Sequence, residues 1–212
     1  MTTNNVILNT GASNIVTCSQ YKFGNASNYF NSANGAFLSV PDSPDWALSG
    51  DFTLDCWINL KSNSATMALI SQVQDENNRW HFHLQADAIG FDVKSSASWT
   101  VGYTLYPDFN LNTWYHVAVV HYGTSYNFYV DGVLIGSTTD ADTIPNMSAP
   151  LLIGKYDRAG DNRLFNGYMD EIRISNTARW TSAFTPPTAE YSVDEYTKLL
   201  MHCNDLTTVE TG

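Results

Sequence analysis

Positive charge is scarce in this chain of 212 residues, which has 10 Lys and Arg against 21 Asp and Glu and a formal net charge of −11. Binding to nucleic acid depends on basic side chains that neutralise phosphates, and attraction to an anionic membrane does too. The composition therefore disfavours both partners. The sequence also lacks any apolar run approaching the ~20 residues of a membrane-spanning helix, so we expect no membrane insertion.

Export signals and cysteine frameworks are not recognisable either. Residues 1–5 have neither a basic region nor an apolar stretch, so we expect synthesis in a cytoplasm without a signal peptide. The three cysteines, Cys18, Cys56 and Cys203, are odd in number and lack metal-ligand spacing. The sequence therefore predicts neither a disulfide scaffold nor a zinc site.

Catalytic patterns are equally sparse. A glycoside hydrolase needs two carboxylates that converge on one sugar, but Asp170 and Glu171 are adjacent, and regular strand alternation would point them to opposite faces. The sequence has no Gly-x-Ser-x-Gly nucleophile turn. We therefore predict that the chain is not an enzyme, with a glycoside hydrolase-related domain as the alternative. The glutamates, none in a pattern that aims two at one sugar, are Glu76, Glu171, Glu190, Glu195 and Glu210.

Aromatic residues, by contrast, are abundant, at 13% of the chain against 15% for charged residues. Aromatic and β-branched side chains suit the pleated, half-buried surface of a sheet. Apolar residues recur with period two between short turns, and helical periodicity is almost absent. The sequence therefore predicts an all-β, two-sheet antiparallel β-sandwich. The expected strands are residues 36–40, 51–60, 68–72, 80–85, 89–95, 100–106, 113–122, 125–130, 133–137, 151–153, 166–174 and 197–203.

Turn residues define how these strands connect. Asp131-Gly132 offers the positive φ angles of a tight primed turn and predicts a two-residue hairpin between residues 126–130 and 133–137. Pro186-Pro187 cannot continue a ladder, so this segment should carry the chain across the surface. No shift in composition marks a boundary, and we expect residues 1–212 to form a single domain.

Three stretches resemble a known family. They are residues 50–58, residues 114–119 with 129–132, and residues 152–154 with 167–179, which read Gly-Tyr-Met-Asp-Glu-Ile-Arg-Ile-Ser-Asn-Thr-Ala-Arg at their end. Their order and spacing resemble the concanavalin A-like, laminin-G-like jelly roll, particularly its bacterial and phage branch. The resemblance covers roughly residues 24 to 180. It concerns the framework, so it implies the fold and leaves the ligand open.

The C-terminal segment supplies a motif that many family members carry near their start. Residues 199–205, Leu-Leu-Met-His-Cys-Asn-Asp, resemble the first strand of the family. We therefore expect residues 197–203 to complete a sheet by pairing beside the strand at residues 168–174.

Two predicted polar loops, residues 75–80 and 156–163, together with Trp99, carry the chemistry that binds sugars. Aromatic faces pack on the C–H patches of a sugar, while amides, carboxylates and guanidinium groups bind its hydroxyls. The alternative is that the aromatic side chains lie in the core and the polar segments are only solvated. His81 and His83 share one face of their strand, where they could be ligands or could merely solvate the outer face while Trp80, Phe82 and Leu84 fill the core. The candidate ligand-binding residues are Asn78, Arg79, Trp80, Trp99, Tyr156, Asp157, Arg158 and Asp161.

A structural Ca²⁺ site is a further hypothesis, which the resemblance implies because relatives often hold calcium with oxygen ligands at a sheet edge. The candidates are Asp170, Asn204 and Asp205. The alternative is that Asp170 accepts backbone hydrogen bonds and that Asp205 is a frayed terminal residue.

The functional prediction is a non-catalytic binding or adhesion module. The lack of an export signal suggests a phage virion protein, such as a tail fibre, a head fibre or a capsid decoration protein, that binds host-surface glycans. The alternatives are a purely structural module that contacts other virion proteins, and a location on a bacterial cell surface. A homo-oligomer would fit a fibre.

Overall fold

The computed structural model describes residues 8–10, 16–63, 65–86, 88–96, 98–105 and 109–204, with the side chains of residues 8–10 and 98–105 left out. The described residues form strands joined by turns and two short 3-10 helices, which confirms the all-β prediction. None of the helices in this part of the chain has the length or apolarity to cross a membrane. The first elements are β1 (Leu8–Thr10), β2 (Val16–Thr17), β3 (Ser27–Phe30), η1 (Ser32–Asn34), β4 (Phe37–Val40), η2 (Pro44–Trp46), β5 (Phe52–Leu60), β6 (Thr66–Val73), β7 (Arg79–Gln85) and β8 (Ala88–Ser95). They are followed by β9 (Ser98–Leu105), β10 (Trp114–Tyr122), β11 (Ser125–Val130), β12 (Val133–Thr139), β13 (Leu151–Ile153), β14 (Lys155–Arg158), β15 (Asp161–Leu164), β16 (Gly167–Ser175) and β17 (Thr197–Met201).

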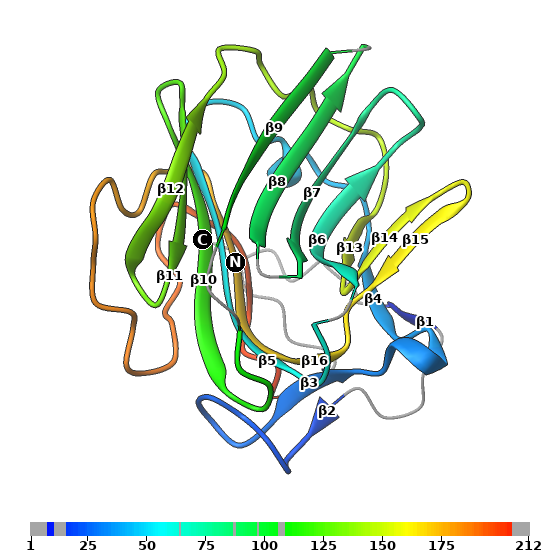
Figure 1. Ribbon diagram of the computed structural model, residues 1–212, viewed down its shortest axis with the longest axis vertical. Helices are drawn as coiled ribbons and strands as arrows, with labels where there is room; N and C mark the ends of the chain where they lie inside the picture. Colours follow the sequence, from blue (N-terminus) through cyan, green and yellow to red (C-terminus); the bar gives the residue numbers. More distant parts are fainter. Residues whose placement is uncertain are drawn as a thin grey trace.

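Most of the described strands make two antiparallel sheets that pack face to face as a β-sandwich, and β14 and β15 form a separate two-stranded sheet (Figure 1). The seven-stranded sheet has the order β1-β4-β13-β6-β7-β8-β9. The eight-stranded sheet has the order β12-β11-β10-β5-β16-β3-β2, and β17 also pairs with β16. Non-consecutive neighbours in both sheets are the mark of a jelly roll, in which the chain crosses repeatedly between sheets.

Strand alternation decides which side chains fill the core. In β5, Leu54, Cys56 and Ile58 point inward and belong to the main hydrophobic cluster. In β7, Trp80 and Phe82 do the same from the opposite sheet. Because side chains alternate along a strand, the intervening residues of both strands face away from the core. The buried polar and charged side chains of β5 and β7 lie on these two outer faces.

The hairpin predicted at Asp131-Gly132 is confirmed. Val130 pairs with Val133, and the two turn residues have φ angles of 48° and 75°. A Cβ at Gly132 would lie 1.9 Å from the carbonyl oxygen of Phe184, so glycine is also required for the close approach of a later segment.

That later segment is the strap, residues 176–196, which crosses the outer face of the eight-stranded sheet. The Phe184 amide donates to the Gly132 carbonyl at 2.9 Å. Trp180 and Phe184 stack with their centroids 3.9 Å apart and pack, with Ala178, against Ala118, Val120 and Tyr129. Figure 1 shows the strap in orange outside β10 and β11. The prediction of a surface crossing around Pro186-Pro187 therefore fits the structure.

After the strap, β17 returns to the sheet. Ile172, Arg173 and Ile174 of β16 pair with Met201, Leu200 and Leu199, which is the pairing expected of residues 197–203. The regular ladder of β16 is interrupted between Asp170 and Arg173 by a bulge in which Glu171 has a φ of 51°. Bulges re-aim side chains, so the simple alternation expected for Asp170 and Glu171 does not describe this strand.

One segment differs from the expectation. Residues 156–163 were expected to be a polar loop, but they form most of a hairpin in which Tyr156 pairs with Arg163 and Arg158 with Asp161. Its turn contains Ala159 and Gly160, and Gly160 has a φ of 78°. Charged side chains are depleted in strands, so the composition pointed to a loop, whereas cross-strand ion pairs supply the stability here.

Candidate functional site

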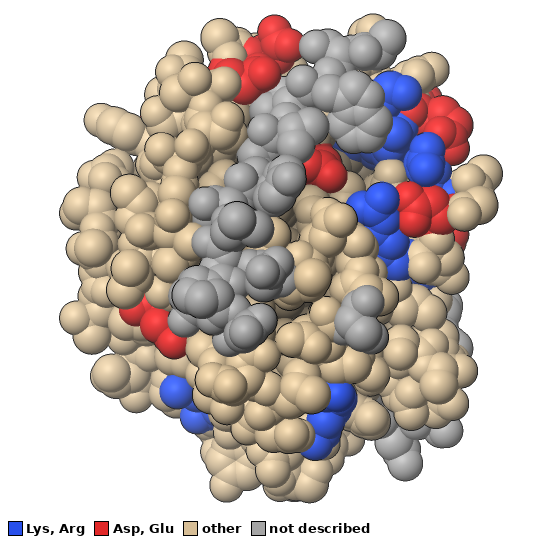
Figure 2. Space-filling view, viewed as in Figure 1, with Lys and Arg blue, Asp and Glu red and all other residues tan. Residues whose placement is uncertain are grey.

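A polar cluster lies on the outer face of the seven-stranded sheet. It combines residues of β7 and β8 with residues of the β14–β15 hairpin, which lies against the neighbouring strand β6. In Figure 2, Lys and Arg side chains mix with acidic ones at the upper right of this face, in the region where Figure 1 places the hairpin. We call it the histidine–arginine cluster, with the members Arg79, His81, His83, Asp92, Tyr156, Arg158, Asp161 and Arg163.

Three stacked rings form its base. The rings of His81 and His83 lie 4.4 Å apart between centroids at an angle of 24°, and the Tyr156 ring centroid lies 4.3 Å from that of His81. All three residues are buried. The sequence puts both histidines on one face of β7, and the β14–β15 hairpin delivers the tyrosine. The expectation that these histidines merely solvate the outer face is therefore wrong, because the hairpin covers them.

Guanidinium groups surround the ring stack. Arg163 Nη1 lies 3.0 Å from His81 Nε2, while its Nε and Nη2 donate to the two Asp161 carboxylate oxygens at 3.0 and 2.9 Å. Arg158 reaches Asp161 at 3.4 Å and Glu76 at 3.1 Å. Arginine presents a rigid fork of donors that suits planar and hydroxyl-bearing acceptors.

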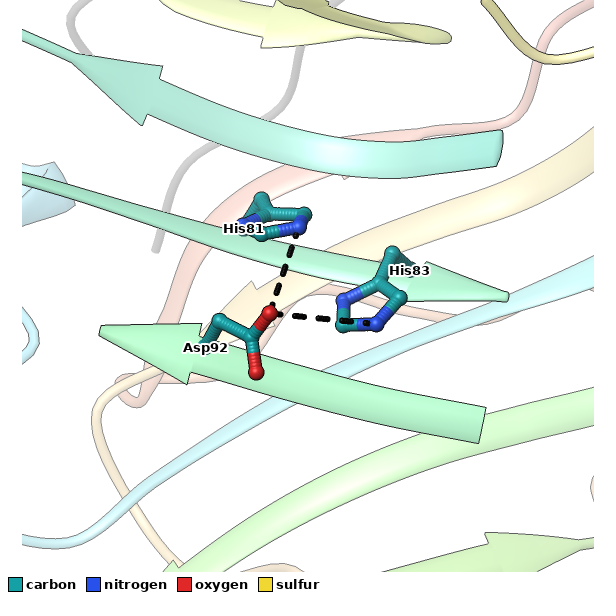
Figure 3. A group of neighbouring side chains, drawn as sticks. All are labelled: His81, His83 and Asp92. Atoms are coloured by element: carbon teal, nitrogen blue, oxygen red, sulfur yellow. Dashed lines mark ion pairs between the residues drawn. The ribbon is translucent and has the colours of Figure 1, made fainter. Parts of the chain in front are cut away.

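Asp92 of β8 closes the cluster (Figure 3). Its Oδ2 lies 3.6 Å from His81 Nε2 and 4.0 Å from His83 Nε2, and its side chain keeps 19% of its exposure. In Figure 3 both imidazoles project from β7 toward this carboxylate. The cross-strand pairs His81 with Asp92 and His83 with Gly90 give this geometry, because the glycine leaves the neighbouring position open.

The electrostatics of the cluster are unfavourable to charge on the histidines. Burial, with help from His83 and from Arg163, lowers the pKa of His81 well below its usual range. Burial lowers the pKa of His83 to about 4. Burial raises the pKa of Asp92 to about 6, although Arg163 and Arg79 act in the opposite direction. Perturbed groups gathered in one place are typical of functional sites, although structural networks also produce them.

A divalent cation is disfavoured in this cluster. Two histidines and one carboxylate have the composition of a transition-metal site, and their ligand atoms lie within 4.8 Å of one another. However, Arg163 already places a donor 3.0 Å from His81 Nε2, the nitrogen that a metal would need. Arg79 and Arg158 add further positive charge, and their proximity to His81 lowers its pKa. The cluster therefore suits a ligand with hydroxyl or anionic oxygens.

The structure brings together only part of the predicted ligand-binding set. Arg79, Tyr156, Arg158 and Asp161 meet in the cluster. Asp157 lies in the same hairpin, where it pairs with Lys155 at 2.8 Å.

The other predicted ligand residues lie elsewhere. Asn78 belongs to the turn before β7, where its amide nitrogen bonds the Asp75 carboxylate at 3.0 Å. Trp80 faces the core, with 1% exposure and its Nε1 donating to Gln72 Oε1 at 3.2 Å, so its indole cannot stack on a surface ligand. Trp99 lies in β9, and its side chain is outside the described residues.

The calcium candidates lie at another place, beside the turn at residues 22–26. Asp170 Oδ2 accepts from the amides of Lys22 and Phe23 at 2.8 and 3.1 Å, and Asn204 Oδ1 accepts from those of Asn25 and Ala26 at 3.1 and 3.3 Å. Both side chains thus clamp the same turn. Asp205 lies outside the described residues.

Carboxylates exceed cations around this turn. Burial and the nearby Glu171 raise the pKa of Asp170 to about 7, even though three backbone amides donate to it. Glu171 bonds His202 at 2.8 Å, and Glu190 bonds Asn204 at 2.8 Å. Glu171, Glu190 and His202 offer ligand atoms within 4.8 Å of one another. The carboxylate and amide oxygens fit Ca²⁺, while the imidazole does not.

Four members of the cluster are absent from the predicted ligand-binding set, namely His81, His83, Asp92 and Arg163, although the sequence left the two histidines as possible ligands. The two histidines carried a usable signal, because their spacing of two residues places them on one strand face. Asp92 carried none, since its approach depends on the register of β7 with β8. Arg163 belongs to the polar segment at residues 156–163, but its approach to His81 depends on the β14–β15 hairpin.

Comparisons with known proteins agree with this architecture. The family model described as the concanavalin A-like lectin/glucanases superfamily matches residues 32–182, which is more than half of the chain. The chain therefore belongs to the concanavalin A-like lectin/glucanases superfamily. No curated protein matches its sequence.

Several solved structures share the fold. Domain 4 of AbnA, a GH43 extracellular arabinanase from Geobacillus stearothermophilus solved in complex with arabinotriose, has a TM-score of 0.63 and 18% identity, over 82% of each chain. The binding domain of botulinum neurotoxin serotype G has a TM-score of 0.62 and 14% identity, over 83% of this chain. The binding domain of botulinum neurotoxin DC in complex with SialylT has a TM-score of 0.62 and 16% identity. The chain spans 44% of each neurotoxin structure. At these identities the likeness concerns the fold.

Proposed function

We propose that the chain is a non-catalytic carbohydrate-binding module and that the histidine–arginine cluster is its ligand site. The observation that carries the proposal is the concentration of Arg79, Arg158 and Arg163 on one outer sheet face of a chain with a net charge of −11. A rigid sheet fixes the base of this site, and a hairpin supplies its rim. Superfamily membership and solved relatives with arabinotriose or SialylT support a saccharide ligand.

The chemistry of the rim suits a saccharide with oxygen-rich substituents. Arg163 and Arg158 keep 28% and 31% of their side-chain exposure, and Asp161 and Asp92 keep 24% and 19%. Guanidinium donors and carboxylate acceptors side by side can bind neighbouring hydroxyl groups of a sugar. The buried histidines and Tyr156 beneath them hold the rim in place, as supporting residues do in a preorganised site.

A glycan array tests this proposal, with labelled protein and two matched variants. Arg163→Ala removes the guanidinium that contacts both His81 and Asp161, so we expect at least about a tenfold loss of signal on every bound glycan. Lys61→Ala is the control. It removes an exposed cation that follows β5 and bonds Asn112, and it should leave binding unchanged. Equal binding by the wild type and by the Arg163→Ala variant would refute the site. An array without any bound glycan would refute the function.

We further propose, on the sequence alone, that the module is part of a phage virion, as a tail-fibre, head-fibre or decoration protein. The alternatives are a purely structural module that contacts other virion proteins and a bacterial cell-surface protein. Mass spectrometry and electron microscopy of purified particles separate these possibilities. Light scattering would add the oligomeric state, and a trimer would favour a fibre.

A further inference from the structure

A hollow lies on the outer face of the eight-stranded sheet, away from the histidine–arginine cluster. It is an open pocket of about 440 Å³, and aromatic rings and prolines form most of its lining. We call it the aromatic groove. Its lining residues are Lys22, Phe23, Trp57, Trp114, Asp131, Thr185, Pro186, Pro187 and Thr188.

Strand alternation puts both indoles on this face. Trp57 lies between the core residues Cys56 and Ile58 of β5 and therefore faces outward. Trp114 begins β10 and pairs with Asn59. Asn59 lies two residues after Trp57 in β5, so Trp114 and Trp57 point to the same face of the sheet. Phe23 packs edge-on against Trp57 with centroids 5.7 Å apart. Trp57 is buried, while Trp114 and Phe23 are partly exposed, and both line the groove.

One cation and one anion border the rings. Lys22 Nζ lies 3.8 Å from the centroid of Trp57, and among the described residues no carboxylate is within salt-bridge distance of it. Burial lowers the pKa of Lys22, while Asp131 acts in the opposite direction. Asp131 Oδ1 accepts a hydrogen bond from the His116 amide at 2.8 Å, and the residue is exposed. The groove therefore offers a donor and an acceptor without net charge.

The wall formed by the strap limits what can bind. Pro186 and Pro187 have no backbone N–H, so an extended peptide cannot pair with this wall as an added strand. The strap itself is fixed next to this wall by the hydrogen bond from Phe184 to Gly132. The groove is thus a preformed hollow with apolar faces and two polar ends, and its volume lies in the range of small-ligand sites.

We infer that the aromatic groove is a second saccharide site, which takes an uncharged sugar ring. The C–H face of the ring would pack on Trp114 and Phe23, and its hydroxyl groups would bond Lys22 and Asp131. A neutral ligand matches the paired charges of the groove, and a polyhydroxy ring matches its mixture of flat apolar surface and polar ends. This inference concerns the opposite sheet and does not rest on the histidine–arginine cluster.

Fluorine NMR of the full chain labelled with 5-fluorotryptophan tests the inference. The probes are the methyl glycosides of glucose, galactose, mannose, N-acetylglucosamine and arabinose. We expect at least one of them to shift the resonances of Trp57 and Trp114 and to leave that of the core residue Trp46 in place. Trp114→Ala should weaken this binding by at least about tenfold. Tyr122→Ala, at the exposed far end of the same strand β10, is the matched control and should bind normally.

A second variant covers the case in which Trp114→Ala misfolds. Asp131→Asn keeps a turn residue that tolerates positive φ and keeps an oxygen for the His116 amide, but it removes the charge. It should weaken binding by a few fold, because hydrogen bonds to charged groups are the stronger ones. If no glycoside shifts the Trp57 and Trp114 resonances, or if both variants bind as the wild type does, the inference is wrong. Arg163→Ala should bind in the groove normally, so failure of the first site and failure of the second are distinguishable.

Discussion

Both outer faces of the sandwich bury charged side chains, but the two faces treat them differently. On the eight-stranded sheet, Asp55 accepts from Arg173 Nε and Nη2 at 3.0 and 2.9 Å and lies 3.2 Å from His116 Nε2. On the seven-stranded sheet, Asp92 comes no closer than 3.6 Å to its histidines. The first carboxylate is completely enclosed by partners, and the second has room beside it.

The pKa values of the two carboxyl groups express the same difference. Burial alone would raise the pKa of Asp55, but Arg173 and His116 outweigh burial and lower it to about 2. Burial prevails at Asp92 and raises its pKa to about 6. A buried charge that its neighbours stabilise is a structural device, whereas one held at a cost to stability suggests a site maintained for binding.

The family motifs belong to the structural face. Arg173, from the Asp-Glu-Ile-Arg stretch, lies between Asp55 and the ring of Tyr191, with its guanidinium carbon 4.0 Å from the ring centroid. Arg179, from the Ala-Arg pair, joins the two ends of the strap by donating to Asp194 at 2.8 and 3.0 Å. This explains why those motifs indicate the fold and not the ligand.

The largest expected effect comes from breaking the enclosed ion pair. Asp55→Ala leaves Arg173 buried and without its carboxylate, so we expect a loss of about 3–5 kcal/mol in the free energy of unfolding, measured by urea denaturation at pH 7. Asp157→Ala, at an exposed ion pair on the hairpin, is the control and should change stability by less than about 0.5 kcal/mol. If the Asp55→Ala variant were as stable as the control, the contacts of Asp55 with Arg173 and His116 would contribute nothing to the free energy of unfolding.

Much of the fold could be predicted because its strands obey simple alternation. Residues 125–130 and 151–153 match β11 and β13, and other predicted strands that begin or end elsewhere differ only by a few residues. The β14–β15 hairpin could not be recognised, because its charged residues read as a loop until their cross-strand partners are known. The short strands β2 and β3, at one side of the eight-stranded sheet, carried too few alternations to be detected.

The candidate site was predictable only in part. Composition alone marked Arg79, Tyr156, Arg158 and Asp161 as binding chemistry, and the structure gathers them. The indole of Trp80 could not be placed by the same reasoning, since alternation allows either face until the core is known. The alternative that put Trp80, Phe82 and Leu84 in the core describes β7 correctly. The burial of His81 and His83 depends on a hairpin that lies more than 70 residues later in the sequence, so no local pattern could predict it.

The next largest effect is the pH dependence of the free energy of unfolding that His83 causes. In the native state His83 has a pKa of about 4, whereas a histidine in the unfolded chain has its ordinary pKa of about 6.5. The unfolded state therefore binds more protons in this window, and the stability due to neutral His83 is lost as pH falls through it. We expect the stability of His83→Gln relative to the wild type to rise by about 3 kcal/mol from pH 7.5 to pH 4. A constant difference across this range would contradict the burial of a neutral imidazole.

Asp92 should show the opposite sign and a smaller size. Its folded pKa of about 6 exceeds the ordinary value of 3.8, so its contribution to stability is complete below pH 3.8 and is lost as pH rises through 6. Asp92→Asn removes this cost and should be more stable than the wild type by about 2 kcal/mol at pH 7, after allowance for the partial exposure of the carboxylate. The gain should vanish at pH 4. A variant that is less stable at pH 7 would mean that Asp92 is satisfied in the way that Asp55 is.

The smallest effect concerns the acidic turn at residues 22–26, where the calcium hypothesis remains a proposal. Asp170, Glu171 and Glu190 outnumber their cationic neighbours there, and Asp170 keeps about one lone pair beyond the three that accept from backbone amides. A weak structural Ca²⁺ at tenfold excess over its dissociation constant would add about 1.4 kcal/mol, or about 3–5 °C in melting temperature. Calorimetry in CaCl₂ and in chelator measures the shift, and Mg²⁺ is the control. Identical melting temperatures and no heat of titration would leave Asp170 and Asn204 as clamps of the turn, a role that their amide contacts already account for.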